Sequence, residues 1–233
     1  MARAPLPREF FARPATEVAP LLLRCVLAAH SADGLVAAEL TEVEAYTGRT
    51  DPASHAFRGK TTRNEVMFGE PGHAYVYFTY GMHFCVNLVC QPAGEAAAVL
   101  LRAGRIVDGA ELAAERRANG AGRAGGPGRG LGAARPVSGP ASARRLAQLA
   151  SGPARLCQAL GITRAQNGAD VCDPAGKLRI YAGDGEGIAA AAVASGPRVG
   201  VSRGAEVPWR FWIEGDSSVS AYRPHVPRRR SEV

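Results

Sequence analysis

The feature that most constrains the fold is a run of 17 residues at positions 74–90, AYVYFTYGMHFCVNLVC. Tyr, Phe and Val are enriched in β-strands, and the Tyr80-Gly81 pair in the middle is typical of a tight turn. We therefore predict a β-hairpin that carries an aromatic ring near its tip.

Further strands are predicted where apolar residues alternate or cluster. Residues 35–46, LVAAELTEVEAY, have a period close to two, which places Glu42, Glu44 and Tyr46 on one face of a strand. We also predict strands at AAAVLLRA (96–103), KLRIYAG (177–183), PRVGV (197–201) and WRFWIEG (209–215), and helices over residues 21–29 and 151–162, the second with Ser151 as N-cap.

Two segments have the composition of loops. Residues 47–73 are rich in Gly, Asp, Pro, Thr and Arg, which indicates a long, irregular connection of the kind that often carries function. Residues 119–140 contain 8 Gly and 3 Pro among 22 residues, so we predict a flexible Gly/Arg-rich insertion within one domain that spans residues 1–233.

The positive charge of the chain is concentrated around this insertion. Residues 102–165 hold 11 Arg and 3 acidic residues, while the whole chain has a net charge of +7. One reading is a mobile arm that binds phosphates, and the other is a composition-biased loop.

Composition narrows the remaining function classes. The 233 residues, 46% of them hydrophobic, suffice for one core but include no apolar run long enough to span a membrane, so we expect a cytoplasmic protein. The Cys and His spacings match no metal site, and we expect no metal and no organic cofactor. Lys occurs only at positions 60 and 177, which leaves almost no candidate for amine-based covalent catalysis.

Several residues could carry chemistry. Glu44, held beside aromatic rings, could act as a general base on water, although two solvated acids on an exposed strand would show the same pattern. His55 with Tyr46 and Tyr77 could form the walls of a slot for a flat heterocycle. Tyr80 could fold back onto the protein or act as a wedge between base pairs. Asn87, inside an apolar strand, could be structural or could discriminate among ligands.

These residues resemble the alkyladenine (3-methyladenine) DNA glycosylases of the human type. The resemblance runs through EVEAYTGRTDPASHAFRGKTTRNEVMF, PGHAYVYFTYGMHFCVNLV, AVLLRA, SGPARLCQALGI, PRVGV and RFWIEG. It implies a mixed α/β (α+β) domain with a curved, mostly antiparallel sheet, surrounding helices and a protruding β-hairpin. It also implies a monomeric, nucleoid-associated enzyme whose partner is double-stranded DNA with damaged purines.

The resemblance implies a role for each matched residue. Glu44 corresponds to the catalytic base, with Arg102 and the backbone carbonyl of Val199 positioning the water. The base would be held by Tyr46, Ala53, His55 and Tyr77, Asn87 would reject the exocyclic amine of guanine, and Tyr80 would intercalate. Lys60, Thr61 or Arg63 would contact the DNA backbone, in a segment slightly shorter than the family's.

The expected reaction is hydrolysis of the N-glycosidic bond of an alkylated or deaminated purine, which leaves an abasic site. Two other readings stay open from the residues alone. One is a catalytically silent nucleic-acid-binding module, and the other is a carbohydrate glycosidase that uses Glu42 and Glu44 as its carboxylate pair.

Overall fold

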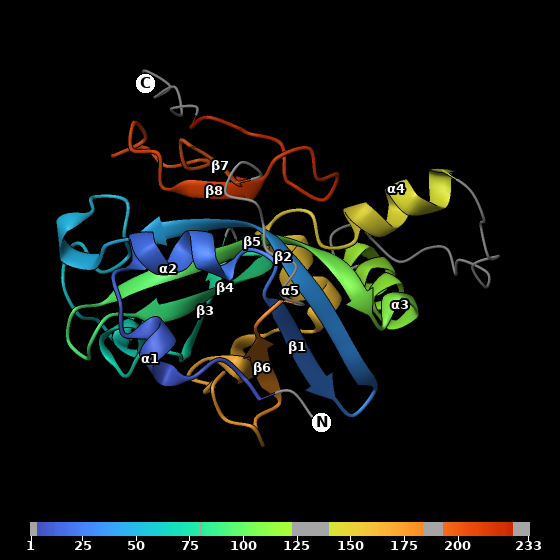
Figure 1. Ribbon diagram of the computed structural model, residues 1–233, viewed down its shortest axis with the longest axis horizontal. Helices are drawn as coiled ribbons and strands as arrows, with labels where there is room; N and C mark the ends of the chain where they lie inside the picture. Colours follow the sequence, from blue (N-terminus) through green and yellow to red (C-terminus); the bar gives the residue numbers. More distant parts are fainter. Residues whose placement is uncertain (1–3, 80, 123–139, 184–192, 226–233) are drawn as a thin grey trace, which may run out of the picture.

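The fold is built on one eight-stranded sheet that curls strongly, shown in Figure 1. This computed structural model describes residues 4–79, 81–122, 140–183 and 193–225. Its strands are β1 (Val26–Ser31), β2 (Gly34–Tyr46), β3 (Ala74–Thr79), β4 (His83–Cys90), β5 (Ala97–Asp108), β6 (Leu178–Tyr181), β7 (Val193–Gly196) and β8 (Arg210–Ile213).

The strand order is β3-β4-β5-β2-β1-β6, with β8 paired to β2 and β7 paired to β8. Every pairing between these strands is antiparallel. The predicted mixed α/β domain with a curved antiparallel sheet is therefore confirmed.

Short helices cover the sheet and close its core. They are α1 (Arg8–Phe11), α2 (Ala15–Leu22), α3 (Ala110–Gly122), α4 (Pro140–Gln148) and α5 (Pro153–Leu160), with 3-10 turns η1 (Gly48–Thr50), η2 (Glu65–Phe68) and η3 (Arg164–Gln166). α2 packs against β2, and α5 packs against β4 and β5. In Figure 1, α1 and α2 lie in front of the sheet, while β7 and β8 lie at the top. None of the helices in the described part of the chain has the length and apolar run that a transmembrane segment requires.

The hairpin forms as predicted, with β3 and β4 paired from Ala74 opposite Leu88 to Thr79 opposite His83. Tyr80, the predicted wedge, lies outside the described residues. Of the predicted insertion at 119–140, residues 123–139 also lie outside them, while residues 119–122 form the end of α3 and residue 140 begins α4.

The helix predicted over residues 21–29 is wrong for most of its length. α2 ends at Leu22, Arg24 has a φ of +66°, and Val26–Ser31 form β1 between β2 and β6. Leu27, Ala28 and Ala29 are all buried, so this strand is apolar on both faces. A short run of this kind has no periodicity that separates strand from helix.

Two smaller predictions also differ from the structure. PRVGV (197–201) is not a strand but the turn that follows β7, where Pro197 has no N–H to donate to a ladder. The N-cap of α5 is Gly152, with a φ of +99°, rather than Ser151. The first of these differences leaves irregular backbone beside β2, where the Val199 N–H reaches the side chain of Glu44.

Asn64 is one of the buried side chains that order the long connection at 47–73. Its Nδ2 donates to the carbonyl oxygens of His55 (2.9 Å) and Gly59 (3.0 Å), and its Oδ1 accepts from the N–H of Thr61 (2.6 Å). This connection also covers a small second core that includes Ala56, Met67 and other buried residues. Asn64 thereby fixes the segment that carries His55.

Three irregularities interrupt the pairing of β2 with β5, one between Ala37 and Ala38 and two compensating β-bulges nearer the cavity. Leu40 and Glu42 oppose Gly104 and Ala103, so Thr41 is the extra residue on β2. Glu42 and Val43 then oppose Ala103 and Leu101, so Arg102 is the extra residue on β5. Bulges change the direction of side chains and are common beside active sites.

Candidate active site

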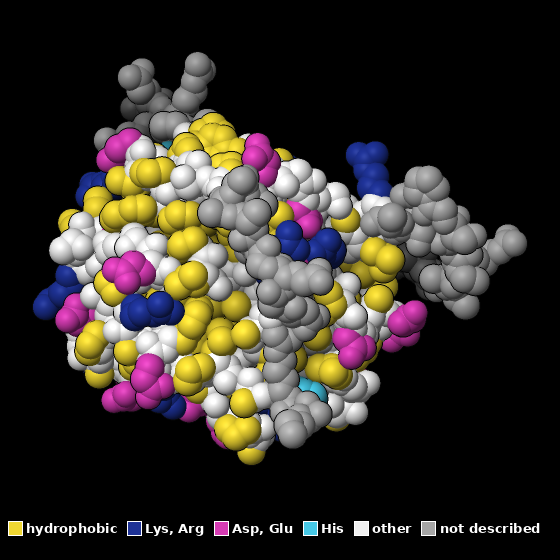
Figure 2. Space-filling view, in the orientation of Figure 1, with side chains coloured by type: hydrophobic (Ala, Val, Ile, Leu, Met, Phe, Trp, Pro, Cys, Tyr) yellow, Lys and Arg dark blue, Asp and Glu magenta, His cyan; other side chains and the backbone are white. Residues whose placement is uncertain are grey.

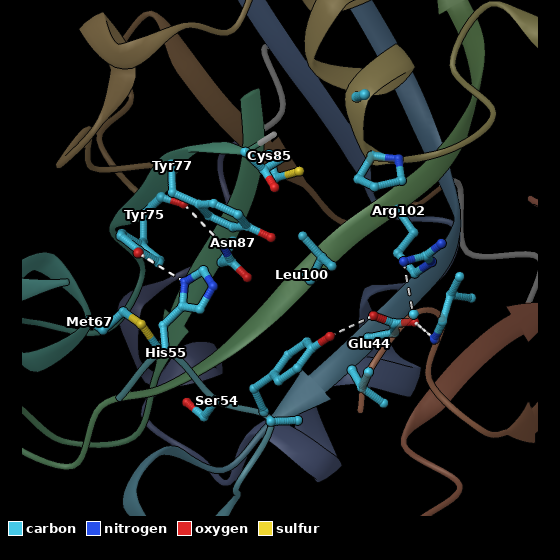
Figure 3. Close-up of a pocket in the computed structure, with 18 of the residues that line it drawn as sticks. Glu44, Ser54, His55, Met67, Tyr75, Tyr77, Cys85, Asn87, Leu100 and Arg102 are labelled. Atoms are coloured by element: carbon cyan, nitrogen blue, oxygen red, sulfur yellow. Dashed lines mark hydrogen bonds and ion pairs between the residues drawn. The ribbon is translucent and has the colours of Figure 1, made fainter. Parts of the chain in front are cut away.

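A cavity of about 480 Å³ opens beside the C-terminal half of β2. Strands β2 to β5 form its floor, as Figure 3 shows, and loop residues 52–55 and 199–202 and the start of α5 complete it. This volume is typical of a site for a small organic molecule.

All eight residues that the sequence analysis assigned to catalysis or base binding line this cavity. They are Glu44, Tyr46, Ala53, His55, Tyr77, Asn87, Arg102 and Val199. The structure thus brings together residues from six separate segments, and their individual roles remain predictions.

The floor of the cavity is a single row of side chains that runs across the sheet. Tyr75 lies opposite Asn87, Asn87 opposite Leu100, and Leu100 opposite Glu44. Beyond Glu44 the register continues to Arg210, which does not line the cavity. Directly opposed residues of an antiparallel sheet share a face. The register therefore places an amide, an apolar side chain and a carboxylate side by side under any bound molecule.

Glu44 is the carboxylate of this site, and it is fully buried at the cavity wall. Its Oε1 accepts a hydrogen bond from the Val199 N–H at 2.7 Å and lies 3.3 Å from Nη1 of Arg102. Its Oε2 accepts a hydrogen bond from the Tyr46 hydroxyl at 2.8 Å. Burial, together with Glu44, raises the pKa of Tyr46 well above its usual value, so Tyr46 stays protonated and donates. These three contacts fix the carboxylate in one orientation.

Arg102 is the cation nearest to Glu44. Burial alone would lower its pKa, but Glu44 and Glu42 raise it above the usual value. Arg102 is thus charged, and its Nη1 points at Glu44 from the cavity floor, as drawn in Figure 3.

Aromatic rings form the opposite side of the cavity. The rings of His55 and Tyr77 meet edge to face with centroids 4.5 Å apart, and Tyr75 stacks on Tyr77 at 5.6 Å. Nδ1 of His55 is 3.1 Å from the Tyr75 hydroxyl and hydrogen-bonds to it. Partial removal from water lowers the pKa of His55, and the charge of Arg63 lowers it further, which favours a neutral ring at pH 7.

Asn87 lies on the cavity floor between these two sides. It is 6% exposed, and its Nδ2 donates to the carbonyl oxygen of Tyr75 at 3.2 Å. Figure 3 shows the carboxamide oxygen on the cavity side. The structural and the discriminating interpretation of Asn87 are therefore compatible.

The three residues predicted to contact the DNA backbone differ in position. Arg63 lines the cavity rim, with its guanidinium carbon 5.8 Å from the centroid of the Tyr77 ring. Lys60 is exposed and does not line the cavity, and Thr61 is engaged with Asn64 through its N–H and its hydroxyl. Figure 2 shows one face of the molecule, on which the described Lys and Arg side chains are scattered among acidic ones.

The sequence analysis missed a buried ion pair behind the cavity, Arg198 with Asp51. Nη1 of Arg198 lies 2.5 Å from Oδ2 of Asp51, and Nη2 lies 2.9 Å from Oδ1. The same guanidinium donates to the Ala45 carbonyl oxygen at 3.0 Å and stacks 4.6 Å from the Tyr46 ring centroid. A charged residue in the otherwise apolar PRVGV was the only signal for it, and a weak one in a chain with 26 Arg.

Glu42 does not face the cavity. It is fully buried and engaged with Arg102, Arg210 and Ser220. Glu42 and Glu44 therefore cannot flank one glycosidic bond, which removes the carbohydrate glycosidase reading.

The described residues contain no group of three or more His, Cys, Asp or Glu side chains arranged to hold a metal ion.

Comparison with known proteins indicates the same family as the resemblance described for the sequence. The model of the methylpurine-DNA glycosylase family matches residues 9–217 of this chain. The chain is 52% identical over 230 residues to a protein of Streptomyces avermitilis. This alignment covers 98% of this chain and 96% of that protein.

Other relatives match along nearly the whole length. A protein of Leifsonia xyli subsp. xyli is 49% identical over 224 residues, covering 94% of this chain and 92% of that protein. A protein of Burkholderia orbicola is 46% identical over 222 residues, covering 95% and 93%. All three carry the provisional name 3-methyladenine DNA glycosylase.

Proposed function

Because this chain belongs to the methylpurine-DNA glycosylase family, we propose that it excises damaged purines from double-stranded DNA by hydrolysis and leaves an abasic site. The chain is a monofunctional DNA glycosylase of DNA repair, as its family and relatives indicate. The choice of purine, the extrusion of the nucleotide and the attacking group belong to the proposal.

The substrate must leave the double helix to react. A stacked base hides its glycosidic carbon, and extruding a nucleotide costs a few kcal/mol, which is least for a base that pairs poorly. Alkylation weakens pairing and gives 3-methyladenine and 7-methylguanine a positive charge. The rings of Tyr46, His55 and Tyr77 would hold such a base by stacking and by cation–π attraction. Tyr80, between β3 and β4 in the sequence, would fill the vacated place in the duplex.

Glu44 would then act as the general base. A water oxygen attacks C1′ of the deoxyribose, one water proton passes to Glu44, and the C1′–N bond breaks with its electrons going to the purine. A positively charged purine leaves as a neutral molecule and needs no proton. The carboxylate also stabilises the positive charge that develops on the sugar.

The observation that supports this most strongly is the geometry of Glu44. It is a buried carboxylate held by the Val199 N–H and the Tyr46 hydroxyl, beside a charged Arg102, at the wall of a cavity lined by aromatic rings. The Val199 N–H holds the carboxylate, and the role predicted for the Val199 carbonyl, to position the water, remains part of the proposal.

The test is the single-turnover excision rate of Glu44→Gln on a duplex with one 7-methylguanine. Loss of a general base costs about 100- to 10,000-fold, and we expect a loss in this range with lesion binding retained. Glu39→Gln is the matched control, because Glu39 lies on the same strand, pairs with Arg105 at 2.7 Å and does not line the cavity. Full excision by Glu44→Gln would refute the assignment of the base.

Two further outcomes separate the alternatives. A covalent complex trapped by borohydride would show an amine nucleophile and contradict hydrolysis by water. Binding of lesion duplexes without excision of any methylated or deaminated purine would instead show a silent binding module.

A further inference from the structure

Glu42 is a buried carboxylate that the proposed reaction does not use. Its Oε1 accepts hydrogen bonds from Nε of Arg102 (2.7 Å), Nε of Arg210 (2.7 Å) and Oγ of Ser220 (2.9 Å). Its Oε2 accepts the N–H of Ser220 at 2.7 Å. So many donors on one buried acid show that Glu42 fixes the groups around it.

The most important of these groups is Arg102. As the extra residue of a β-bulge, Arg102 is not constrained by the regular alternation of β5, and its side chain needs other contacts to fix it. Nε is bound by Glu42 and Nη2 donates to Oγ of Ser220 at 3.2 Å. Nη1 is left to face Glu44.

The same cluster sets the charge beside Glu44. Glu42 and Glu44 carry two negative charges, and Arg102 and Arg210 carry two positive ones. Arg210 lies opposite Glu44 in the β2–β8 register, yet its Nε binds Glu42.

The remaining titratable groups that act on Glu44 come from its own strand and three neighbouring elements. They are Tyr46 on β2, Tyr77 on β3, Cys85 on β4 and Arg198 in the loop after β7. Burial raises the pKa of each of the two tyrosines and of Cys85, so these three stay neutral at pH 7. The field at Glu44 is therefore set by Arg102 and Arg198, and by the Glu42–Arg210 pair behind them.

We propose that Glu42 is a positioning residue of the excision reaction, which holds Arg102 against Glu44 and offsets the charge of Arg210. The inference rests on the proposed function, because it assigns Glu42 to the reaction of that same cavity. Without the charge of Glu42, two guanidinium groups would act on Glu44 unopposed. Glu44 would become a weaker base, and Arg102 would lose the anchor at Nε.

Glu42→Gln tests both effects, because Gln keeps the shape of the side chain and one oxygen acceptor, removes the charge, and replaces the second acceptor oxygen by an NH2 group that cannot accept. On a 7-methylguanine duplex, we expect the single-turnover rate to fall about 10- to 100-fold, since small displacements of a positioned group cost up to about 100-fold. We expect binding of the lesion duplex to change by less than about twofold, because Glu42 does not line the cavity.

The pH profile distinguishes positioning from a structural role. The charged 7-methylguanine leaves without a proton, so the loss of rate at acid pH reports the base. Glu42→Gln should move this acid limb to lower pH, since positive charge favours the ionised carboxylate. Arg210→Gln should move it to higher pH, because it removes a positive charge while the negative charge of Glu42 stays. A purely structural defect would not shift the two profiles in opposite directions.

The controls separate this inference from the proposed function. Wild type and Glu39→Gln must excise, and if neither does, the proposed function fails first. If both excise and Glu42→Gln matches them in rate and pH profile, only the role of Glu42 is refuted. Equal or parallel shifts in Glu42→Gln and Arg210→Gln would refute it as well.

Circular dichroism will show whether both buried variants fold. If they do not, Ser220→Ala decides, since it removes only the hydroxyl that contacts Glu42 and Arg102 and leaves every charge in place. We expect a rate loss of about fivefold with the acid limb unmoved. A wild-type rate in Ser220→Ala would overturn the proposal.

Discussion

The Asp51–Arg198 pair predicts a large and specific loss of stability. Asp51 is 1% exposed and Arg198 is also 1% exposed, and two hydrogen bonds join them. Asp51→Asn keeps Oδ1, which accepts the Ala53 N–H at 3.0 Å, but removes the negative charge. The variant therefore leaves the buried guanidinium of Arg198 without its counter-charge.

The expected cost follows from that burial. Removing one partner of a buried ion pair destabilises a protein by about 3–5 kcal/mol, whereas an exposed pair contributes about 0–1 kcal/mol. Arg198 also binds the Ala45 carbonyl oxygen and stacks on Tyr46, so the loss will reach the strand that carries Glu44. For a chain of this size, the melting temperature should fall by roughly 6–20 °C.

Urea unfolding followed by circular dichroism measures the free energy of unfolding directly. Asp33→Asn is the control, because Asp33 is 74% exposed and lies 3.9 Å from Arg116. It should stay close to wild type. If Asp51→Asn unfolds with a free energy within about 1 kcal/mol of wild type, the pair is not the buried anchor that the distances indicate.

Two further predictions concern specificity and acid stability. Asn87→Ala should raise excision of 7-methylguanine relative to hypoxanthine by about 10-fold in single-turnover assays, and an unchanged ratio would contradict the discriminating role. Burial alone would raise the pKa of Asp170, but the Cys172 N–H and Arg8 lower it below the ordinary 3.8, so wild type should lose stability as the pH falls through that lowered pKa. Asp170→Asn should be less stable than wild type at about pH 6, and its free energy of unfolding should fall less between about pH 6 and pH 3. Urea unfolding at the two pH values measures this difference. An equal fall in both proteins would refute the prediction.

Local patterns sufficed where apolar and polar residue types alternate along a strand or where two strands flank a marked turn. The hairpin of β3 and β4 and the strand β2 follow directly from residue type and alternation. β1 did not, because its buried Leu27, Ala28 and Ala29 have no polar residues between them to reveal a period. β5 was predicted correctly from the equally apolar run AAAVLLRA, so apolar composition alone does not decide between strand and helix.

The candidate site was found through its motifs, but its supporting contacts were not. Ser220 lies 178 residues from Glu42, and Arg198 lies 147 residues from Asp51. Neither separation leaves a local pattern, and the abundance of Arg hid Arg198 and Arg210 among many surface residues. Such partners follow from the packing of β8 and the C-terminal segment on β2, which only the three-dimensional structure shows.

The register of β2 and β5 explains why Glu42 and Glu44 differ although they share one face in the alternation. With Thr41 as the extra residue on one strand and Arg102 on the other, the two bulges cancel, and Glu44 comes to lie opposite Leu100 on the cavity floor. A net slip of one residue would turn that side chain to the other face of the sheet. The bulges also bring Arg102 within reach of both acids. They direct the Thr41 hydroxyl to the Ser218 hydroxyl, with 2.7 Å between the two oxygen atoms. Ser218 lies two residues before Ser220, which binds Glu42. The irregularity of these strands thus makes one acid a buried anchor and leaves the other at the cavity wall.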